Sequence, residues 1–207
     1  MNIILQNVGF SFSENKFLSN ISINLSIGQS YAIIGPNGSG KSTLLKLIAG
    51  YLTPSEGVIE YIVNGKLING NDIFKYIAIA APYIELIEDF TIKEMIKFHF
   101  KFKKIINNYS IDFIINKANL TKYLYTFISN CSSGIKQKLR LTLALFSDVP
   151  VLLLDEPLTN LDNTTTEWYL SEFNSKIFRQ NKLLVICSNN NNNEYFFCDE
   201  IITLKPK

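Results

Sequence analysis

The pattern of apolar and polar residues divides the chain into three parts. Residues 1–76 alternate between short strand-like runs and turns, and residues 30–34 form an apolar run typical of a strand. Residues 43–49 then carry Leu and Ile at helical spacing and stop at Gly50, a residue type that commonly follows the end of a helix. The first part therefore predicts a β-rich region that contains one strand–loop–helix unit.

The rest of the chain is first helical and then mixed. Residues 83–145 carry apolar residues three and four positions apart, which predicts a mostly helical stretch. Residues 146–207 return to alternating strands and helices, for which right-handed crossovers are expected. Within them, residues 151–154 are apolar throughout, as in a strand buried on both faces. We predict a single domain over residues 1–207, with a helical subdomain inserted at about residues 83–145.

Composition excludes several classes of protein. The chain has 207 residues, enough to bury one core, and its formal charge of +2 is too small to predict a nucleic-acid partner. Its three cysteines have no metal-ligand spacing, and with a single histidine no zinc site is expected. The cysteines fit a reducing cytoplasm. The sequence shows neither a signal peptide nor an apolar run near the roughly twenty residues that cross a bilayer.

A complete G-x-x-x-x-G-K-[ST] motif separates the predicted strand at 30–34 from the helix that follows. Its residues are Gly35, Pro36, Asn37, Gly38, Ser39, Gly40, Lys41, Ser42 and Thr43. In such a loop the backbone N–H groups cradle phosphate oxygens, and the helix N-terminus adds a favourable dipole. Lys41 is predicted to reach the β- and γ-phosphates, and Ser42 to ligate Mg²⁺. The ligand predicted from this motif is a nucleoside triphosphate with Mg²⁺.

Two acidic residues follow the apolar run 151–154. Asp155 and Glu156 are expected at the carboxyl edge of a parallel sheet, where such sheets bind ligands. We predict that Asp155 holds Mg²⁺ through water and that Glu156 orients or deprotonates an attacking water. An apolar strand followed by two acids is common in itself. Downstream of a phosphate loop, it becomes a specific sign of nucleotide hydrolysis.

A third motif begins about twenty residues before Asp155. Residues 131–140 resemble the Leu-Ser-Gly-Gly-Gln signature and basic helix of the ATP-binding cassette (ABC) ATPases, with Ser132 and Gly134 in the places of the serine and the second glycine. The resemblance implies that Ser132 and Gly134 contact the γ-phosphate of an ATP bound by the opposite subunit. A serine at a helix N-terminus suits an anion physically. Taken alone, the same residues are more simply interpreted as an ordinary helix cap.

Further matches extend the resemblance over nearly the whole chain. Residues 160–162, which end in Asp162, are similar to the loop that crosses the dimer interface in this family. Phe12 lies 23 residues before Gly35, where the family places an aromatic ring that stacks on adenine. Phe10 is the alternative, and either ring could belong to the core instead. The implied fold is an α/β P-loop NTPase core of ABC type with an N-terminal antiparallel β-subdomain and an inserted helical subdomain.

The chain departs from the family at two positions. ABC ATPases carry a glutamine at the junction to the helical subdomain, but the equivalent position lies near Pro82 and no glutamine is found there. They also use a histidine after the last core strand, where this chain has Asn189. The sole histidine, His99, precedes Asp155 and cannot take that place. We predict that Asn189 still donates a neutral hydrogen bond to phosphate, and that hydrolysis is slow rather than abolished.

Together these features predict the ATP-binding and ATP-hydrolysing subunit of an ABC transporter. By resemblance it works as a homodimer, or as a heterodimer with a second cassette, on transmembrane permease subunits of separate chains. It is then a cytoplasmic protein, peripheral at the inner face of the cell membrane. Three alternatives stay open: an ATP-gated binding or regulatory subunit with little hydrolysis, a non-transport ABC ATPase, and an unrelated phosphate-loop kinase or GTPase.

Two segments outside the motifs also carry predictions. Five aromatic residues near the start of the helical stretch form either a docking surface for a membrane subunit or the core of the helical subdomain. They are Tyr83, Phe90, Phe98, Phe100 and Phe102. Residues 189–193 are five consecutive asparagines, which predict a mobile polar loop.

Overall fold

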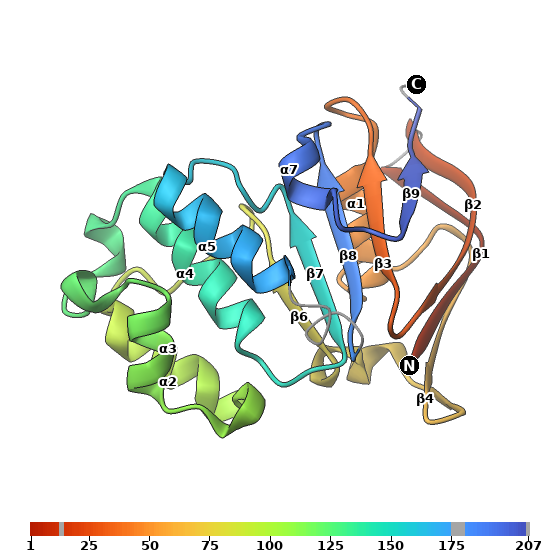
Figure 1. Ribbon diagram of the computed structural model, residues 1–207. Helices are drawn as coiled ribbons and strands as arrows, with labels where there is room; N and C mark the ends of the chain where they lie inside the picture. The colour runs from red at the N-terminus through yellow and green to blue at the C-terminus, as the bar shows by residue number, and fades with distance from the viewer. Residues whose placement is uncertain (13–14, 175–180, 206–207) are drawn as a thin grey trace.

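The computed structural model describes residues 1–12, 15–174 and 181–205, and the described strands form two sheets (Figure 1). One sheet is antiparallel, with the strand order β2-β1-β4-β5. Its strands are β1 (Asn2–Phe12), β2 (Asn15–Ser26), β4 (Glu56–Val63) and β5 (Lys66–Ile68). The other sheet is parallel, with the order β6-β7-β8-β3-β9. Its strands are β3 (Ser30–Ile34), β6 (Ile77–Ala80), β7 (Val151–Asp155), β8 (Leu183–Ser188) and β9 (Glu200–Thr203).

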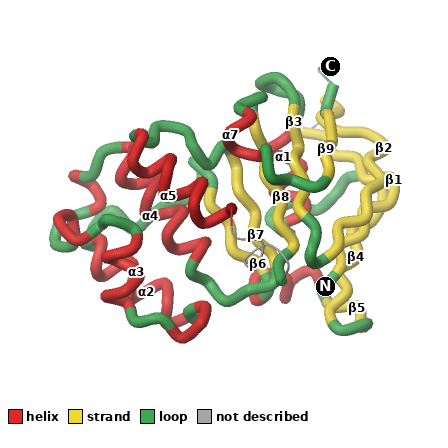
Figure 2. The backbone as a smooth tube through the Cα atoms, viewed as in Figure 1, coloured by secondary structure: helices red, strands yellow, loops and turns green. Residues whose placement is uncertain are grey.

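Helices lie on both faces of the parallel sheet. On one side α1 packs in a core that it shares with both sheets, and on the other side the longer helices form a separate group (Figure 2). In the described residues the α-helices are α1 (Lys41–Ile48), α2 (Ile92–Phe102), α3 (Ile111–Lys117), α4 (Ser133–Leu145), α5 (Asn163–Asn174) and α7 (Asn192–Tyr195). Short 3₁₀ turns are η1 (Gly70–Lys75), η2 (Ile106–Asn108), η3 (Thr121–Tyr123) and η4 (Ile128–Asn130). None of the described helices is long and apolar enough to span a membrane.

The parallel sheet is buried on both faces, as its uninterrupted apolar runs predict. Every residue of β7 and β8 is buried. Because successive side chains of a strand point to opposite faces, Val151 and Leu153 pack with α1 and the antiparallel sheet, whereas Leu152 and Leu154 pack with the helical group. The sheet thus separates two cores. The α/β fold predicted from the sequence is confirmed, including the strand predicted over residues 30–34.

The helices α2, α3 and α4 come between β6 and β7 in the chain. We propose that they form the helical subdomain expected within residues 83–145. The start of α2 is fixed by a reciprocal pair of hydrogen bonds, because Thr91 Oγ1 accepts the N–H of Glu94 and the Glu94 carboxylate accepts the N–H of Thr91. The start of α4 is capped by the Ser132 hydroxyl, which accepts the N–H of Ile135 at 3.3 Å. Ser132 is therefore a helix cap, as predicted.

Two predictions need correction. The five aromatic residues do not act as one unit, because Tyr83 lies under the ammonium of Lys46 on α1, 4.0 Å from the ring centroid, while Phe98 and Phe102 are exposed on α2. The asparagine run is not simply a loop. Asn191 caps α7, and the last two asparagines are helical, since an asparagine carbonyl readily accepts a hydrogen bond from the first turn of a helix.

Candidate functional site

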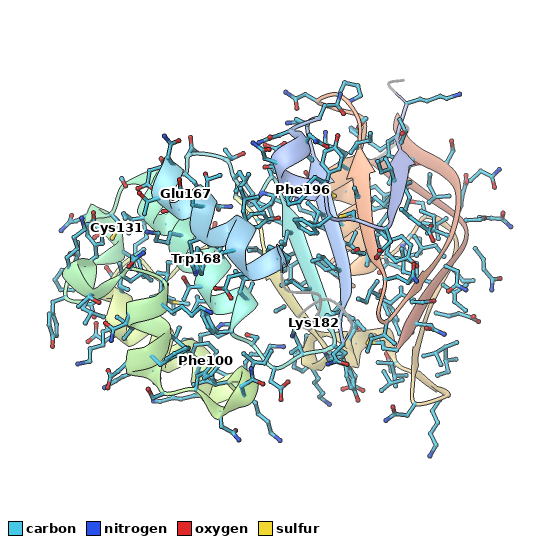
Figure 3. The ribbon with its side chains drawn as sticks, viewed as in Figure 1. Phe100, Cys131, Glu167, Trp168, Lys182 and Phe196 are labelled. Atoms are coloured by element: carbon cyan, nitrogen blue, oxygen red, sulfur yellow. The ribbon has the colours of Figure 1, made fainter. Side chains whose placement is uncertain are left out.

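Three chain segments leave the carboxyl edge of the parallel sheet side by side. Ile34 at the end of β3 pairs with Ser188 at the end of β8, and Asp155 ends β7 on the other side of β8. From these strand ends the chain continues into the phosphate loop, into Asn189 and into Glu156. Open α/β sheets bind their ligands at this edge. Figure 3 marks the opposite edge by Lys182, directly before β8.

The phosphate loop closes around the side chain of Lys41, which is 5% exposed. Its ammonium donates to the carbonyl oxygens of Gly35 at 2.8 Å and Pro36 at 3.0 Å. Gly40, directly before α1, has φ 96°, and a Cβ there would lie 2.7 Å from Cδ2 of Leu18. Only glycine fits this position without strain. The loop therefore holds its lysine at the N-terminus of α1, where the helix dipole favours an anion.

The other loop residues differ in exposure. Pro36, Asn37 and Gly38 are exposed, Gly35 and Ser39 are buried, and Ser42 and Thr43 are half-buried on α1. No heavy atom lies within 4 Å of a Cβ built on Gly38. The rim of the loop is thus open to a ligand while its base is packed.

Asp155 provides a buried carboxylate beside this loop. It is 2% exposed, and burial raises the pKa of its carboxyl, while a hydrogen bond from Ser42 and the charge of Lys41 oppose the rise. Asp155 Oδ1 and Ser39 Oγ are buried without a hydrogen-bond partner, a state that costs free energy unless a ligand satisfies them. Carboxylate and hydroxyl oxygens are the ligands that Mg²⁺ prefers. Ser42 and Asp155 thus fit the predicted magnesium site.

Asn189 joins the lysine to the second acidic residue. Its Oδ1 accepts a hydrogen bond from Lys41 Nζ at 2.5 Å, and its Nδ2 donates to Glu156 Oε1 at 2.5 Å. An amide side chain has both a donor and an acceptor end, so one residue can contact a cation and an anion at once. The structure thereby brings Lys41, Asn189 and Glu156 into one hydrogen-bonded series beside Asp155.

The backbone of Glu156 is in the left-handed region, with φ 46°. Such a conformation is uncommon for a residue other than glycine and is found at functional sites. It is held by the N–H of Glu156, which donates to the carbonyl oxygen of Cys187 at 2.9 Å. Glu156 Oε2 also accepts the hydroxyl of Thr159 at 3.3 Å. Thr159 is a contact that the sequence motif did not reveal.

Ser132 and Gly134 lie at the start of α4, and Asp162 lies directly before α5. Asp162 Oδ1 accepts the N–H of Thr165 at 2.7 Å, and this bonding lowers the pKa of the Asp162 carboxyl. A Cβ on Gly134 would lie 2.6 Å from the carbonyl oxygen of Asn160. The structure thus joins the signature-like segment to the segment 160–162, and groups neither with Lys41.

The two candidate aromatic rings near the start of the chain differ in exposure. Phe12 is 54% exposed, whereas Phe10 is 7% exposed and packs in the core. The rings of Phe12 and Phe17 meet edge to face with centroids 5.4 Å apart, and the adjacent Leu18 lies against Gly40 of the phosphate loop. Of the two rings, Phe12 is the one that a ligand can reach.

The junction where the family glutamine is missing contains a residue that the motifs did not single out. Pro82 is exposed, but the hydroxyl of the next residue, Tyr83, is buried without a hydrogen-bond partner. Burial raises the pKa of Tyr83, and the nearby charge of Asp155 adds to the rise. Tyr83 therefore contributes a buried polar group close to the candidate magnesium site.

Comparisons with known proteins agree with this geometry. A family model described as ABC transporter matches residues 18–159. The petrobactin import ATP-binding protein FpuC of Bacillus anthracis is 34% identical over 77% of this chain and 62% of its own length. The spermidine/putrescine import ATP-binding protein PotA of Fusobacterium nucleatum is also 34% identical, over 77% of this chain and 43% of its own length. The matched segments thus span only about half of these relatives.

Among solved structures, the dimeric bacterial ABC transporter cassette MJ0796 superposes with a TM-score of 0.81, at 25% identity, over 98% of this chain and 94% of that one. The similarity therefore covers both sheets and the helical group. Because the family model also matches more than half of the sequence and includes the phosphate loop, Asp155 and Glu156, the chain belongs to the ABC transporter family.

Proposed function

We propose that this chain is the ATP-binding and ATP-hydrolysing subunit of an ABC transporter. The observation that carries the proposal is the hydrogen-bonded series from Lys41 through Asn189 to Glu156, at the sheet edge beside Asp155. It joins a cation suited to phosphate, a carboxylate suited to orienting water, and an amide that contacts both. Membership of the family and the ATP-binding relatives support the same ligand.

Each residue of the series has its own role in the proposed hydrolysis. Lys41 balances charge on the β- and γ-phosphates. Glu156 orients the attacking water in line with the γ-phosphate and accepts its proton. Asn189 donates a neutral hydrogen bond through Nδ2 to a phosphate oxygen. Ser42, and Asp155 through water, would hold Mg²⁺, which would supply positive charge to the phosphate oxygens.

The proposed turnover is slow. Asn189 stands where ABC ATPases use a histidine, and an amide can neither carry charge nor hold a proton for the transferring group. Pro82 has no side-chain donor or acceptor. Loss of one well-placed polar contact to the reacting group typically lowers a rate on the order of a hundredfold or more. The remaining set of Lys41, Asp155 and Glu156 supports hydrolysis at a reduced rate.

A second copy or a second cassette completes the site in this proposal. Gly134 packs against Asn160, and Ser132 caps the same helix, which supports a role of this segment towards the nucleotide of a neighbouring chain. The dimeric cassette among the similar structures supports this arrangement. Each ATP then lies between one phosphate loop and the other chain's Ser132–Gly134, with Phe12 stacked on the adenine.

The proposed partners are transmembrane permease subunits on separate chains, so that the protein acts at the inner face of the cell membrane. The exposed rings of Phe98 and Phe102 on α2 meet edge to face at 5.2 Å, and Phe98 meets Phe90 at 5.4 Å. These rings are the part of the predicted aromatic surface that a partner can reach. Relatives named as import ATP-binding proteins support a transport role.

Steady-state ATP hydrolysis across a range of protein concentrations tests the proposal. Turnover should rise faster than linearly with protein concentration, because each site needs two chains, and Glu156→Gln should abolish it. Glu167→Gln is a matched control, since Glu167 is exposed on α5 (Figure 3), and it should keep full turnover. Hydrolysis that survives in Glu156→Gln would contradict the proposal.

One observation favours a second candidate function, an ATP-gated subunit with little hydrolysis. Asn189 bonds the lysine and the carboxylate to each other, and it replaces the usual histidine. A chain that forms a stable dimer with ATP, but shows no turnover above that of Glu156→Gln even with its membrane partner present, would support this candidate.

A further inference from the structure

The buried carboxylate of Glu194 has no part in the proposed hydrolysis. Glu194 lies in α7 and is 3% exposed. Burial raises the pKa of its carboxyl, while hydrogen bonds from Ser188 and from the N–H of Leu158 oppose the rise. A buried carboxylate is costly unless it is hydrogen-bonded. Its partners therefore identify the part of the structure that depends on it.

One partner is the loop that follows the two acidic residues. Glu194 Oε1 accepts the N–H of Leu158 at 3.0 Å, and Leu158 is the second residue after Glu156. On its other side α7 is fixed to α5, because the Tyr169 hydroxyl donates to the carbonyl oxygen of Glu194 at 3.0 Å. Glu194 thus ties the start of the loop 157–162 to a helix that is itself anchored in the core.

The same loop contacts both the catalytic carboxylate and the signature-like segment. Thr159 donates to Glu156 Oε2 at 3.3 Å. One residue later, the carbonyl oxygen of Asn160 approaches Gly134 so closely that a Cβ there would lie 2.6 Å away. A shift of this loop would therefore move the surface around Gly134.

The helix that carries Glu194 begins three residues after Asn189, at Asn192. Ser188 Oγ accepts the N–H of Asn191 at 3.2 Å, so Asn189 and the start of α7 belong to one tight turn. This turn lies at the carboxyl edge of the sheet, near the labelled Phe196 in Figure 3. A small cavity of about 190 Å³ lies between the turn after β8 and the loop 157–162. Its lining residues are Glu156, Leu158, Thr159, Asn189, Asn191 and Glu194.

We propose that Glu194 is a positioning residue that transmits the state of Asn189 to the loop 157–162, and through that loop to the surface around Gly134. The proposal rests on the proposed function, in which Asn189 meets the nucleotide and Gly134 meets the second chain. Nucleotide that draws Asn189 away from Lys41 moves the turn at the start of α7. Glu194 then carries the change to Leu158.

The test compares the native chain with Glu194→Gln and Glu194→Met. Glutamine keeps an acceptor oxygen for the N–H of Leu158, whereas methionine keeps the length of the side chain and removes the acceptor. Each protein is studied with Mg²⁺ and a non-hydrolysable ATP analogue. Three quantities are measured: the affinity for the analogue in dilute protein, nucleotide-dependent self-association by sedimentation, and nucleotide-dependent hydrogen exchange of the amides in the loop 157–162.

In the native chain and in Glu194→Gln, the analogue should slow exchange in the loop and promote self-association. In Glu194→Met the affinity for the analogue should be unchanged, because in the described residues no hydrogen bond joins Glu194 to the phosphate loop. Its self-association should weaken about tenfold, a usual size for coupling between sites, and the exchange response should disappear.

A Glu194→Met variant that melts at a lower temperature but keeps the native exchange response and self-association would show a structural role only, and would overturn the proposal. A native loop that does not respond to the analogue would overturn it as well. Failure of the native chain to bind the analogue would instead refute the proposed function. If Glu194→Met fails to fold, Tyr169→Phe takes its place, because it removes the bond from the Tyr169 hydroxyl to the carbonyl oxygen of Glu194 and keeps the ring. Tyr169→Phe should weaken the self-association and the exchange response, and a native response in this variant would overturn the proposal.

Discussion

The substitution Asn189→Ala separates a catalytic role of this residue from a structural one. Alanine removes both the bond from Lys41 Nζ and the bond to Glu156 Oε1. Lys41 keeps the carbonyl oxygens of Gly35 and Pro36 as acceptors, so its place in the loop should not change. The variant therefore alters the reacting groups while leaving the phosphate loop intact.

The expected change in stability is small. A hydrogen bond to a charged group contributes about 1.5–3 kcal/mol when the loss leaves a buried group unpaired. Asn189 is exposed, so water can replace it at both partners. Substitutions at such surface positions change the free energy of unfolding by about 0.5 kcal/mol. Because both partners of Asn189 are charged, we expect Asn189→Ala to lose more than this, up to about 1 kcal/mol.

The expected change in catalysis is larger. If Asn189 donates to the transferring group, its loss should lower kcat on the order of a hundredfold, which corresponds to about 2.7 kcal/mol of transition-state stabilisation. Urea unfolding and steady-state hydrolysis are measured on the same preparations, with Asn193→Ala, an exposed residue of the same asparagine run, as the control. A native kcat in Asn189→Ala, with ATP binding intact, would refute the reasoning.

Three further experiments test the fold around the site. Burial lowers the pKa of His99 from 6.5 to about 4, so on acidification the unfolded state binds this proton before the folded state does. Between about pH 6.5 and about pH 4 the free energy of unfolding, measured with urea, should therefore fall by up to about 3 kcal/mol. The fall should be smaller in His99→Gln. Gly134→Ala places a Cβ against the carbonyl oxygen of Asn160 and should lower the free energy of unfolding by about 1–3 kcal/mol. Thermal denaturation measures this loss, and an unchanged melting temperature would contradict the contact. Tyr83→Phe removes a buried hydroxyl without a hydrogen-bond partner and should not destabilise the protein. Tyr61→Phe loses a hydrogen bond to the carbonyl oxygen of Leu47, so its free energy of unfolding, measured with urea, should fall by about 1 kcal/mol.

The sequence predicted those parts of the site whose residues are contiguous. The phosphate loop follows β3 directly and Asp155 ends β7, so each motif carries its own strand and its own turn. Parallel pairing then brings the strand ends to one edge without further information. The apolar runs were likewise enough to predict β3 as a strand and β7 as a strand buried inside the parallel sheet.

Contacts between distant segments could not be predicted in this way. Asn189 was expected to face a phosphate, but nothing in the sequence indicated that it would bond Lys41 and Glu156, which lie 148 and 33 residues away. The composition of the asparagine run suggested a loop, and this hid Glu194 at its end. A glutamate in a polar segment looks like a solvated residue, and its burial follows from tertiary contacts of α7 with α5 and with the loop 157–162.

In the proposed function, the hydrogen-bond donors of Lys41 link nucleotide binding to the release of Glu156. A lysine ammonium has three N–H donors, and in this structure they go to Gly35 O, Pro36 O and Asn189 Oδ1. A phosphate oxygen must share or replace one of these acceptors. The two carbonyl groups belong to the loop backbone, whereas Asn189 is an exposed side chain, so its oxygen is the acceptor that phosphate displaces at least cost. Once displaced, the amide no longer holds Glu156 in its present position. Phosphate binding and the freeing of the carboxylate for water are then one event, and the asparagine supplies that connection although it cannot supply a proton.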